Sequence, residues 1–170
     1  GSGTVGPATM AATAKHDGYT LAQMPITVYR LPLMQKTTWK ADDFTYIIHL
    51  TGYVFAAFSS ASTPFKTWQE VIDYAKANPG KLNFASSGNG SIQHIAGELF
   101  KQLTATSITH VPYKGAGPAV QDLLGGQVDI FITTPASVVS QVKAGKLKAL
   151  ATTGAARLAA LPQVPTAAEA

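Results

Sequence analysis

Apolar residues recur along this chain with two alternating periods. Short runs of β-branched and aromatic residues predict strands, and segments with an apolar residue every three or four positions predict amphipathic helices. The expected strands cover residues 19–23, 44–50, 53–59, 81–85, 107–111, 128–133 and 147–152. The expected helices cover residues 8–15, 67–78, 91–103, 118–125 and 135–145. Residues 25–43 lack a clear period and predict a loop with one helical turn. Strands that alternate with helices predict an α/β fold with a mainly parallel sheet.

Helix boundaries carry recognisable signals. Thr67, followed by Glu70 three positions later, predicts a capping box at a helix start. Pro118 suits the first turn of a helix, and Gly145 suits the end of another. The helix at 91–103 is expected to turn one apolar face to the core, and its members are Ile92, Ile95, Ala96, Leu99, Phe100 and Leu103.

A polar loop precedes that helix and is the first candidate binding site. Its residues are Ser86, Ser87, Gly88, Asn89, Gly90 and Ser91. Glycines let backbone N–H groups turn toward a ligand, and the start of a helix attracts negative charge. The same residue types are also preferred in an N-cap with a flexible turn. Spacing alone leaves both interpretations open. The loop is neither a Walker A motif nor a G-x-G-x-x-G motif.

Further candidate residues follow other strands. Open α/β sheets bind ligands at the carboxyl ends of their strands. We expect Tyr113 and Lys114 to reach a ligand from one such loop, although a packed tyrosine and a surface lysine remain the alternative. Thr133 and Thr134 offer hydroxyls in the next loop, where simple helix capping is the alternative. The last candidate is an apolar wall, and its members are Met24, Pro25 and Thr27.

Composition narrows the classes of partner. Of the 170 residues, 46% are hydrophobic and 13% are charged, which allows a substantial core and argues against disorder. The net charge of +4 favours anions weakly. The basic residues are scattered and no RNA-binding signature is present, so no nucleic-acid partner is expected. The chain contains no cysteine and no apolar run of 18 residues, so we expect neither thiol chemistry nor a membrane-embedded segment.

Few residues point to catalysis. The histidines show no metal-ligand spacing, no G-x-S-x-G elbow is present, and the carboxylates do not pair in a candidate loop. We therefore predict no metal, no cofactor and no catalytic residue, and we interpret His94 as a capping or packing residue. Two other classes stay open. One is an enzyme that acts on a carboxylate through Lys114 or His94, and the other is a module that binds a protein through an apolar patch.

Three long stretches resemble a known family. They read ANPGKLNFASSGNGSIQHIAGELFKQLT, HVPYKGAGPAVQDLLGGQVDIFI and VKAGKLKALATTGAARLAALPQVPTAAEA. They resemble the Bug (TctC-like) family, the periplasmic solute receptors of tripartite tricarboxylate transporters. The resemblance extends over essentially the whole chain. It implies a receptor, located in the periplasm, that captures a small organic carboxylate and delivers it to the permease subunits of a transporter in the membrane.

The resemblance also implies an architecture. Family members have the two-lobed, Venus-flytrap fold of type II periplasmic binding proteins, with the ligand in the cleft between the lobes. Residues 1–50 would then be a partial first lobe, 51–149 a complete second lobe, and 150–170 a partial return to the first. We interpret the chain as a fragment that lacks N- and C-terminal parts of the first lobe, with Gly1–Gly3 as a candidate cloning remnant.

Two departures from the family pattern bear on the ligand. The loop 86–91 matches the family's second carboxylate-binding loop, and Tyr113 and Lys114 match its Pro-Tyr-Lys/Arg-Gly motif. Relatives often carry an acidic residue or Asn near Thr133 and Thr134. Met24 and Pro25 replace a stretch that is often small and polar. These differences favour a partly apolar ligand, with aromatic carboxylates among the candidates.

Overall fold

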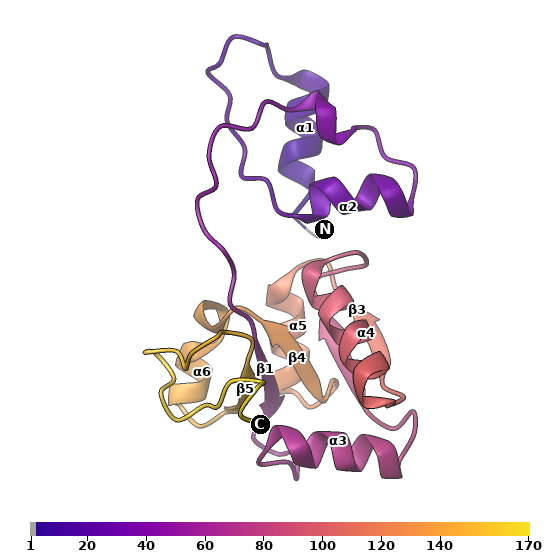
Figure 1. Cartoon of the computed structure of the whole chain (residues 1–170), viewed down its shortest axis with the longest axis vertical. Helices are drawn as coiled ribbons and strands as arrows, with labels where there is room; N and C mark the ends of the chain where they lie inside the picture. Colours follow the sequence, from indigo (N-terminus) through magenta and orange to yellow (C-terminus); the bar gives the residue numbers. More distant parts are fainter. Residues whose placement is uncertain (1–2) are drawn as a thin grey trace.

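A five-stranded sheet organises the larger part of the molecule. The computed structural model describes residues 3–170. Its strands are β1 (Ala56–Ser60), β2 (Asn83–Ser86), β3 (Thr109–Pro112), β4 (Ile130–Thr133) and β5 (Leu147–Thr152), in the order β3-β2-β4-β1-β5 (Figure 1). β2 pairs in parallel with β3 and β4, whereas β1 is antiparallel to β4 and β5. The predicted α/β fold is confirmed, with β1 as the one reversed strand.

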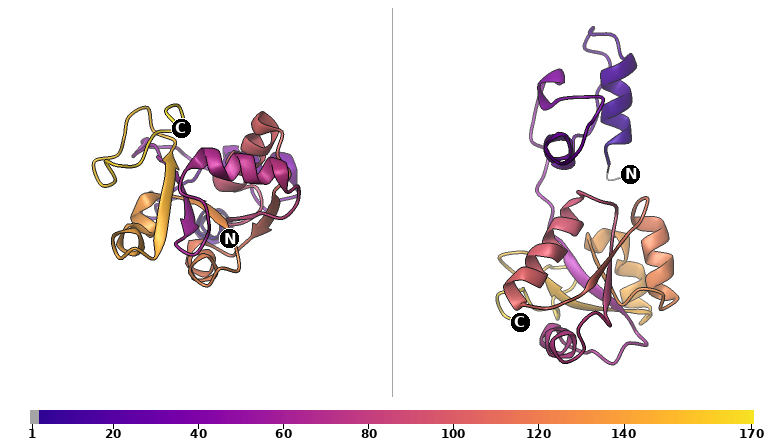
Figure 2. Two further views of the ribbon diagram at one scale, coloured as in Figure 1. Left: turned by 90° about the horizontal axis from the view of Figure 1, so that it is seen from below. Right: turned by 90° about the vertical axis from the view of Figure 1, so that its right-hand side faces the viewer.

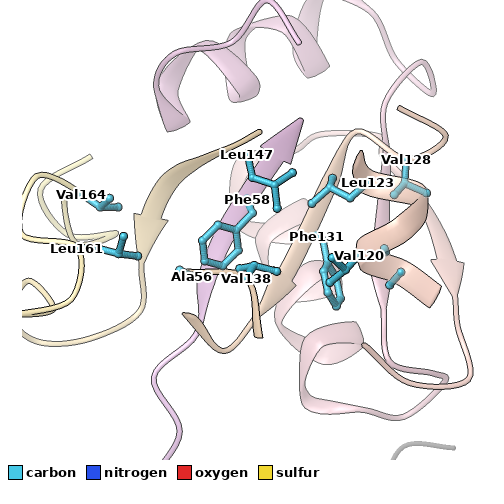
Figure 3. Close-up of a cluster of buried hydrophobic side chains, with 12 residues drawn as sticks. Ala56, Phe58, Val120, Leu123, Val128, Phe131, Val138, Leu147, Leu161 and Val164 are labelled. Carbon is cyan, nitrogen blue, oxygen red and sulfur yellow. The ribbon is translucent and has the colours of Figure 1, made fainter. Parts of the chain in front are cut away.

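Helices cover both faces of this sheet. On one face α3 (Trp68–Ala77) and α4 (Ile92–Thr104) bury a core that includes Phe84 and Ile132. On the other face lie α5 (Ala116–Leu124), the short helix η2 (Pro135–Ser137) and α6 (Val139–Lys143). Phe58 and Phe131 are fully buried beneath them (Figure 3). Neighbouring strand residues alternate between the two cores because their side chains point to opposite faces.

The predicted start of α3 is confirmed at atomic detail. The Glu70 N–H donates to Thr67 Oγ1 at 3.2 Å, and the Lys66 N–H donates to a Glu70 carboxylate oxygen at 2.7 Å. The first bond satisfies an N–H group in the first turn of the helix, which the helix itself leaves without a partner, and the second fixes the residue before the N-cap. Asn78 ends the helix, as expected, and its N–H donates to the Tyr74 carbonyl.

The apolar face predicted for α4 is partly wrong. Ile92 and Phe100 pack on the core, but Ile95, Leu99 and Leu103 are 37%, 51% and 77% exposed. The reason is Gly97, which is buried against Phe84. Because glycine has no side chain, the helix turns this position to the sheet and approaches it closely, which rotates the bulkier residues toward solvent.

Two predicted strands, 19–23 and 44–50, are wrong in this structure. Both segments run without regular secondary structure, and Tyr19, Leu21, Ile47 and Ile48 are strongly exposed. A strand needs a neighbour for its backbone hydrogen bonds, and within residues 3–170 no other strand lies beside either segment. Their alternating pattern therefore has no sheet to join here.

The N-terminal residues form a separate small core. It contains α1 (Val5–Thr13), α2 (Thr27–Met34) and the short helix η1 (Ala41–Asp43). Val28, Leu31, Trp39 and Phe44 are buried there. The predicted helix 8–15 corresponds to α1, whereas α2 forms a helix of eight residues within the predicted loop 25–43. An extended segment joins this unit to the sheet, and the right-hand view of Figure 2 shows the unit beyond one end of the sheet.

The last residues stay close to the sheet. Leu161 and Val164 are buried in the same core as Phe58 (Figure 3), and Thr152 forms an isolated bridge with Thr166. The Thr166 N–H donates to Glu169 at 2.7 Å, which is one half of a capping box. The expected lobe boundaries, including the return of 150–170 to the first lobe, stay a prediction.

Candidate functional site

The loop 86–91 lies at the carboxyl end of β2 and leads into α4. Ser91 is the N-cap of α4, and its side chain accepts a hydrogen bond from the His94 N–H at 3.3 Å. β2, β3 and β4 are parallel, so the loops that follow them gather at one edge. The Tyr113 N–H indeed donates to the Ser86 carbonyl at 3.0 Å. The structure therefore brings the first two predicted loops into direct contact.

Hydrogen bonds inside the loop fix its shape. The Gly88 N–H donates to Ser86 Oγ at 3.2 Å, and Ser86 Oγ donates to the Gly88 carbonyl at 3.2 Å. The Gly90 N–H donates to His94 Nδ1 at 3.2 Å. The expectation that both glycine N–H groups face a ligand therefore does not match this structure. Both already have partners within the protein.

Other donors remain at this helix start. Among residues 3–170, the N–H groups of Ile92 and Gln93 have no hydrogen-bond partner, as is usual in the first turn of a helix. Ser87 Oγ donates to Gln93 Oε1 at 3.0 Å, and Asn89 lies exposed at the tip of the loop. The anion-binding capacity of the loop thus resides mainly in the first turn of α4.

Two histidines stack behind the loop. The ring centroids of His94 and His110 lie 4.0 Å apart, and their planes form an angle of 15°. The ring centroid of Phe84 lies 4.9 Å from that of His110. His110 Nε2 lies 2.7 Å from Ser86 Oγ. Burial of the ring, with the neighbouring His94 as the second cause, lowers the pKa of His110 from 6.5 to about 4. His110 is therefore neutral at pH 7.

The predicted residues of the second loop point in different directions. The Tyr113 hydroxyl donates to Asp122 on α5 at 2.6 Å, and its ring packs on the core. Burial, followed by the bond to Asp122, raises the pKa of Tyr113 to about 12. Its hydroxyl is therefore directed at α5, the helix that follows this loop. Lys114 is exposed, and no carboxylate within residues 3–170 lies at ion-pair distance from it.

The third predicted loop leads into a short helix without a side-chain cap. Thr133 is buried at the end of β4, which pairs with β2. Thr134 is the N-cap of η2, and its Oγ1 lies 3.0 Å from Ser137 Oγ. Both threonines lie at the same sheet edge as the loop 86–91, because β2 and β4 are parallel neighbours.

The apolar residues beside the loop 86–91 differ from those that the sequence predicted. Met24 packs into the N-terminal core, Pro25 lies against Gly3, and Thr27 is buried at the start of α2. Leu31 and Met34 of α2 lie closest to Gly90 in this loop. A Cβ built on Gly90 would lie 3.0 Å from Leu31 Cδ1 and 3.4 Å from Met34 Sδ.

Sequence reasoning missed this wall because it missed α2. The signal was present in the spacing of Val28 and Leu31, which are three positions apart and both buried. Pro32 obscured it, since proline usually excludes a helix interior. Here Pro32 lies inside a helix of only eight residues.

Alanine at Gly90 tests this contact. Gly90 has φ +72°, so alanine there is strained by about 1 kcal/mol even in open space. Gly80 has φ +74° but no atom near its missing Cβ, which makes Gly80→Ala a matched control. We expect Gly90→Ala to lower the unfolding free energy by about 1 kcal/mol more than Gly80→Ala, because Leu31 must also move. Chemical denaturation measures both, and equal losses would contradict the contact.

One cavity lies away from the loop 86–91. It has a volume of about 860 Å³ and is lined by α1 and the exposed segment 15–23, with Met10 and Tyr19 among its walls. None of its lining residues belongs to the loop 86–91. Within residues 3–170 there is no cluster of three or more potential metal ligands, and no helix is long and apolar enough to cross a membrane.

The whole chain matches a known receptor family. The family model for the tripartite tricarboxylate transporter family receptor matches residues 1–170. A UPF0065 protein from the gbd 5′ region of Cupriavidus necator is 45% identical over 167 residues, which are 98% of this chain and 51% of that protein. The chain therefore spans about half the length of the curated relatives it matches.

Two solved structures from Rhodopseudomonas palustris resemble the fold. MatC with bound malate has a TM-score of 0.86 and 31% identity, with 99% of this chain and 58% of that chain covered. Rpa4515 with adipate has a TM-score of 0.67 and 36% identity, with 69% and 40% covered. The matching family is described as a receptor family, which gives no support to the alternative of catalysis by Lys114 or His94. The fold, the helix start at the sheet edge and the full-length family match agree: the chain belongs to the tripartite tricarboxylate transporter receptor family.

Proposed function

We propose that the protein is an extracytoplasmic solute receptor, located in the periplasm, that captures a small organic carboxylate. The observation that carries the proposal is the helix start at Ser91, where the N–H groups of Ile92 and Gln93 lack partners within residues 3–170. The positive end of a helix dipole stabilises an anion by about 0.3–1 kcal/mol, and by ~2 kcal/mol when partly buried. Two structural neighbours hold malate and adipate, both of which carry carboxylates.

The surroundings suggest how a ligand would be selected. One carboxylate would accept hydrogen bonds from the N–H groups in the first turn of α4 and from the Ser91 hydroxyl. Leu31 and Met34 of α2 would contact its apolar part, since they already pack on Gly90. Thr133 and Thr134 lie at the same sheet edge and would shape the remaining side. Transfer of the solute to the permease subunits of a tripartite transporter completes the proposal and follows from the family.

A thermal-shift screen of the full-length protein tests the proposal. We expect a small mono- or dicarboxylate to raise the melting temperature, and malate, adipate and benzoate are the first probes. A ligand at 100 times its Kd stabilises the folded state by about 2.7 kcal/mol, which is a rise of several degrees.

Matched neutral compounds provide the control. Malamide and adipamide keep the carbon chains of malate and adipate but lack their negative charges, so they should leave the melting temperature unchanged. A rise caused only by cationic solutes, or an equal rise with acid and amide, would overturn the proposal.

A further inference from the structure

We infer that the stacked rings of His94 and His110 position the loop 86–91, because each ring forms a hydrogen bond with one end of the loop. The inference rests on the proposed function and deepens it. Ser86 stands at the strand end of the loop, and His110 Nε2 lies 2.7 Å from its Oγ. Gly90 lies at the other end of the loop, just before α4 begins, and its N–H donates to His94 Nδ1 at 3.2 Å. Each end of the loop is therefore attached to one ring of the same stack.

The stack joins two different elements. His110 belongs to β3 and His94 to the first turn of α4, and their rings are almost parallel at 4.0 Å. Phe84 of β2 extends the stack on the far side of His110. A displacement of either ring would therefore move the other, along with the loop end that it holds.

The arrangement also decides which donors face a ligand. With the Gly90 N–H directed at His94, the N–H groups of Ile92 and Gln93 are donors that have no hydrogen-bond partner in the described part of the chain. His94 Nδ1 accepts a hydrogen bond, so it must be unprotonated, and the ring proton of the neutral form lies on Nε2. His94 Nε2 lies 3.9 Å from Glu98 Oε1, and Glu98 Oε2 forms an ion pair with Lys101 Nζ at 2.8 Å. Neither ring needs to touch the ligand, so both act as positioning residues.

Isosteric variants separate the hydrogen bonds from general packing. Asn places its Oδ1 close to the position of a histidine Nδ1, and Gln places its amide close to that of Nε2. His94→Asn and His110→Gln should therefore keep the bonds to Gly90 and Ser86, whereas His94→Leu and His110→Leu remove them and keep apolar bulk. With the carboxylate that binds the full-length protein, we expect calorimetric Kd values within about threefold of wild type for Asn and Gln. We expect a loss of about tenfold for each Leu variant, which corresponds to one hydrogen bond.

The outcomes distinguish this inference from the proposed function. If the wild-type protein binds no carboxylate, the proposed function fails. If wild type binds but the Leu variants bind equally well, or if Asn and Gln lose as much as Leu, the positioning role is overturned.

Nitrogen NMR of the wild-type protein gives a readout that does not depend on any variant or on the ligand. We expect His94 Nδ1 to carry no proton and to accept the hydrogen bond of the Gly90 N–H. A protonated Nδ1 in wild type would overturn the inference even if every variant failed to fold.

Discussion

Replacement of Gly97 by alanine is expected to lower the unfolding free energy by about 2–3 kcal/mol, the upper part of the range for overpacked cores. A Cβ at this position would overlap Cε2 and Cζ of Phe84. The Phe84 ring has little room to move, because it is 3% exposed and lies 4.9 Å from the ring of His110. The helix would therefore have to shift away from the sheet. Urea denaturation of wild type and variant measures the loss.

Gly117→Ala is the matched control. Gly117 also lies within a helix, α5, but no atom lies within 4 Å of its missing Cβ. Since alanine favours helices over glycine by up to about 1 kcal/mol, this variant should be as stable as wild type or slightly more so. A Gly97→Ala protein as stable as Gly117→Ala would show that α4 does not approach the sheet so closely.

The strain introduced by Gly97→Ala is also expected to affect the proposed binding site. The ring of Phe84 contacts that of His110, and the ring of His110 stacks on that of His94. A displacement of Phe84 would therefore also displace the two histidine rings beside the loop 86–91. The same close contact that turns Gly97 to the sheet also places the start of α4 at the carboxyl end of β2. The core and the proposed site therefore depend on one glycine.

Local signals predicted the second half of the fold well. The bounds of β5 agree with the expected strand at 147–152, and Thr67 and Ser91 cap α3 and α4 as their spacing suggested. These signals act within a few residues, so the sequence displays them directly. The strands expected at 19–23 and 44–50 failed because a strand depends on a neighbour, which no local pattern can supply.

The candidate site was predictable in its position and less so in its chemistry. The run of serine and glycine marked the loop 86–91, and parallel strands explained why Tyr113 lies beside it. The partners of the loop came from far along the chain. His110 lies 24 positions from Ser86, and Leu31 belongs to a helix that Pro32 concealed. His94 was interpreted as a capping or packing residue, and the structure confirms it, since it accepts from the Gly90 N–H and stacks on His110.

Acid is expected to destabilise the folded protein through His110. Its folded pKa is about 4, below the ordinary value of 6.5, because burial disfavours the charged ring. Well above pH 6.5 the ring is neutral in both the folded and the unfolded protein, so its titration does not change the unfolding free energy. Between pH 6.5 and 4 the unfolded chain binds a proton that the folded protein excludes, so the unfolding free energy falls as the pH falls. The ring is half-buried and partly screened by solvent, so we expect a loss of about 1–2 kcal/mol from this group instead of the full linkage value.

His110→Gln isolates this contribution from the carboxylates that also titrate in acid. Gln keeps a hydrogen bond to Ser86 but cannot bind the proton, whereas every other group is shared with wild type. Urea denaturation at pH 7, 5.5 and 4.5 should therefore give a steeper loss of stability for wild type than for the variant. The difference should open below pH 6.5 and stop growing near pH 4. Parallel curves would mean that His110 is protonated as readily in the folded protein as in the unfolded chain, which a ring stacked between His94 and Phe84 should not allow.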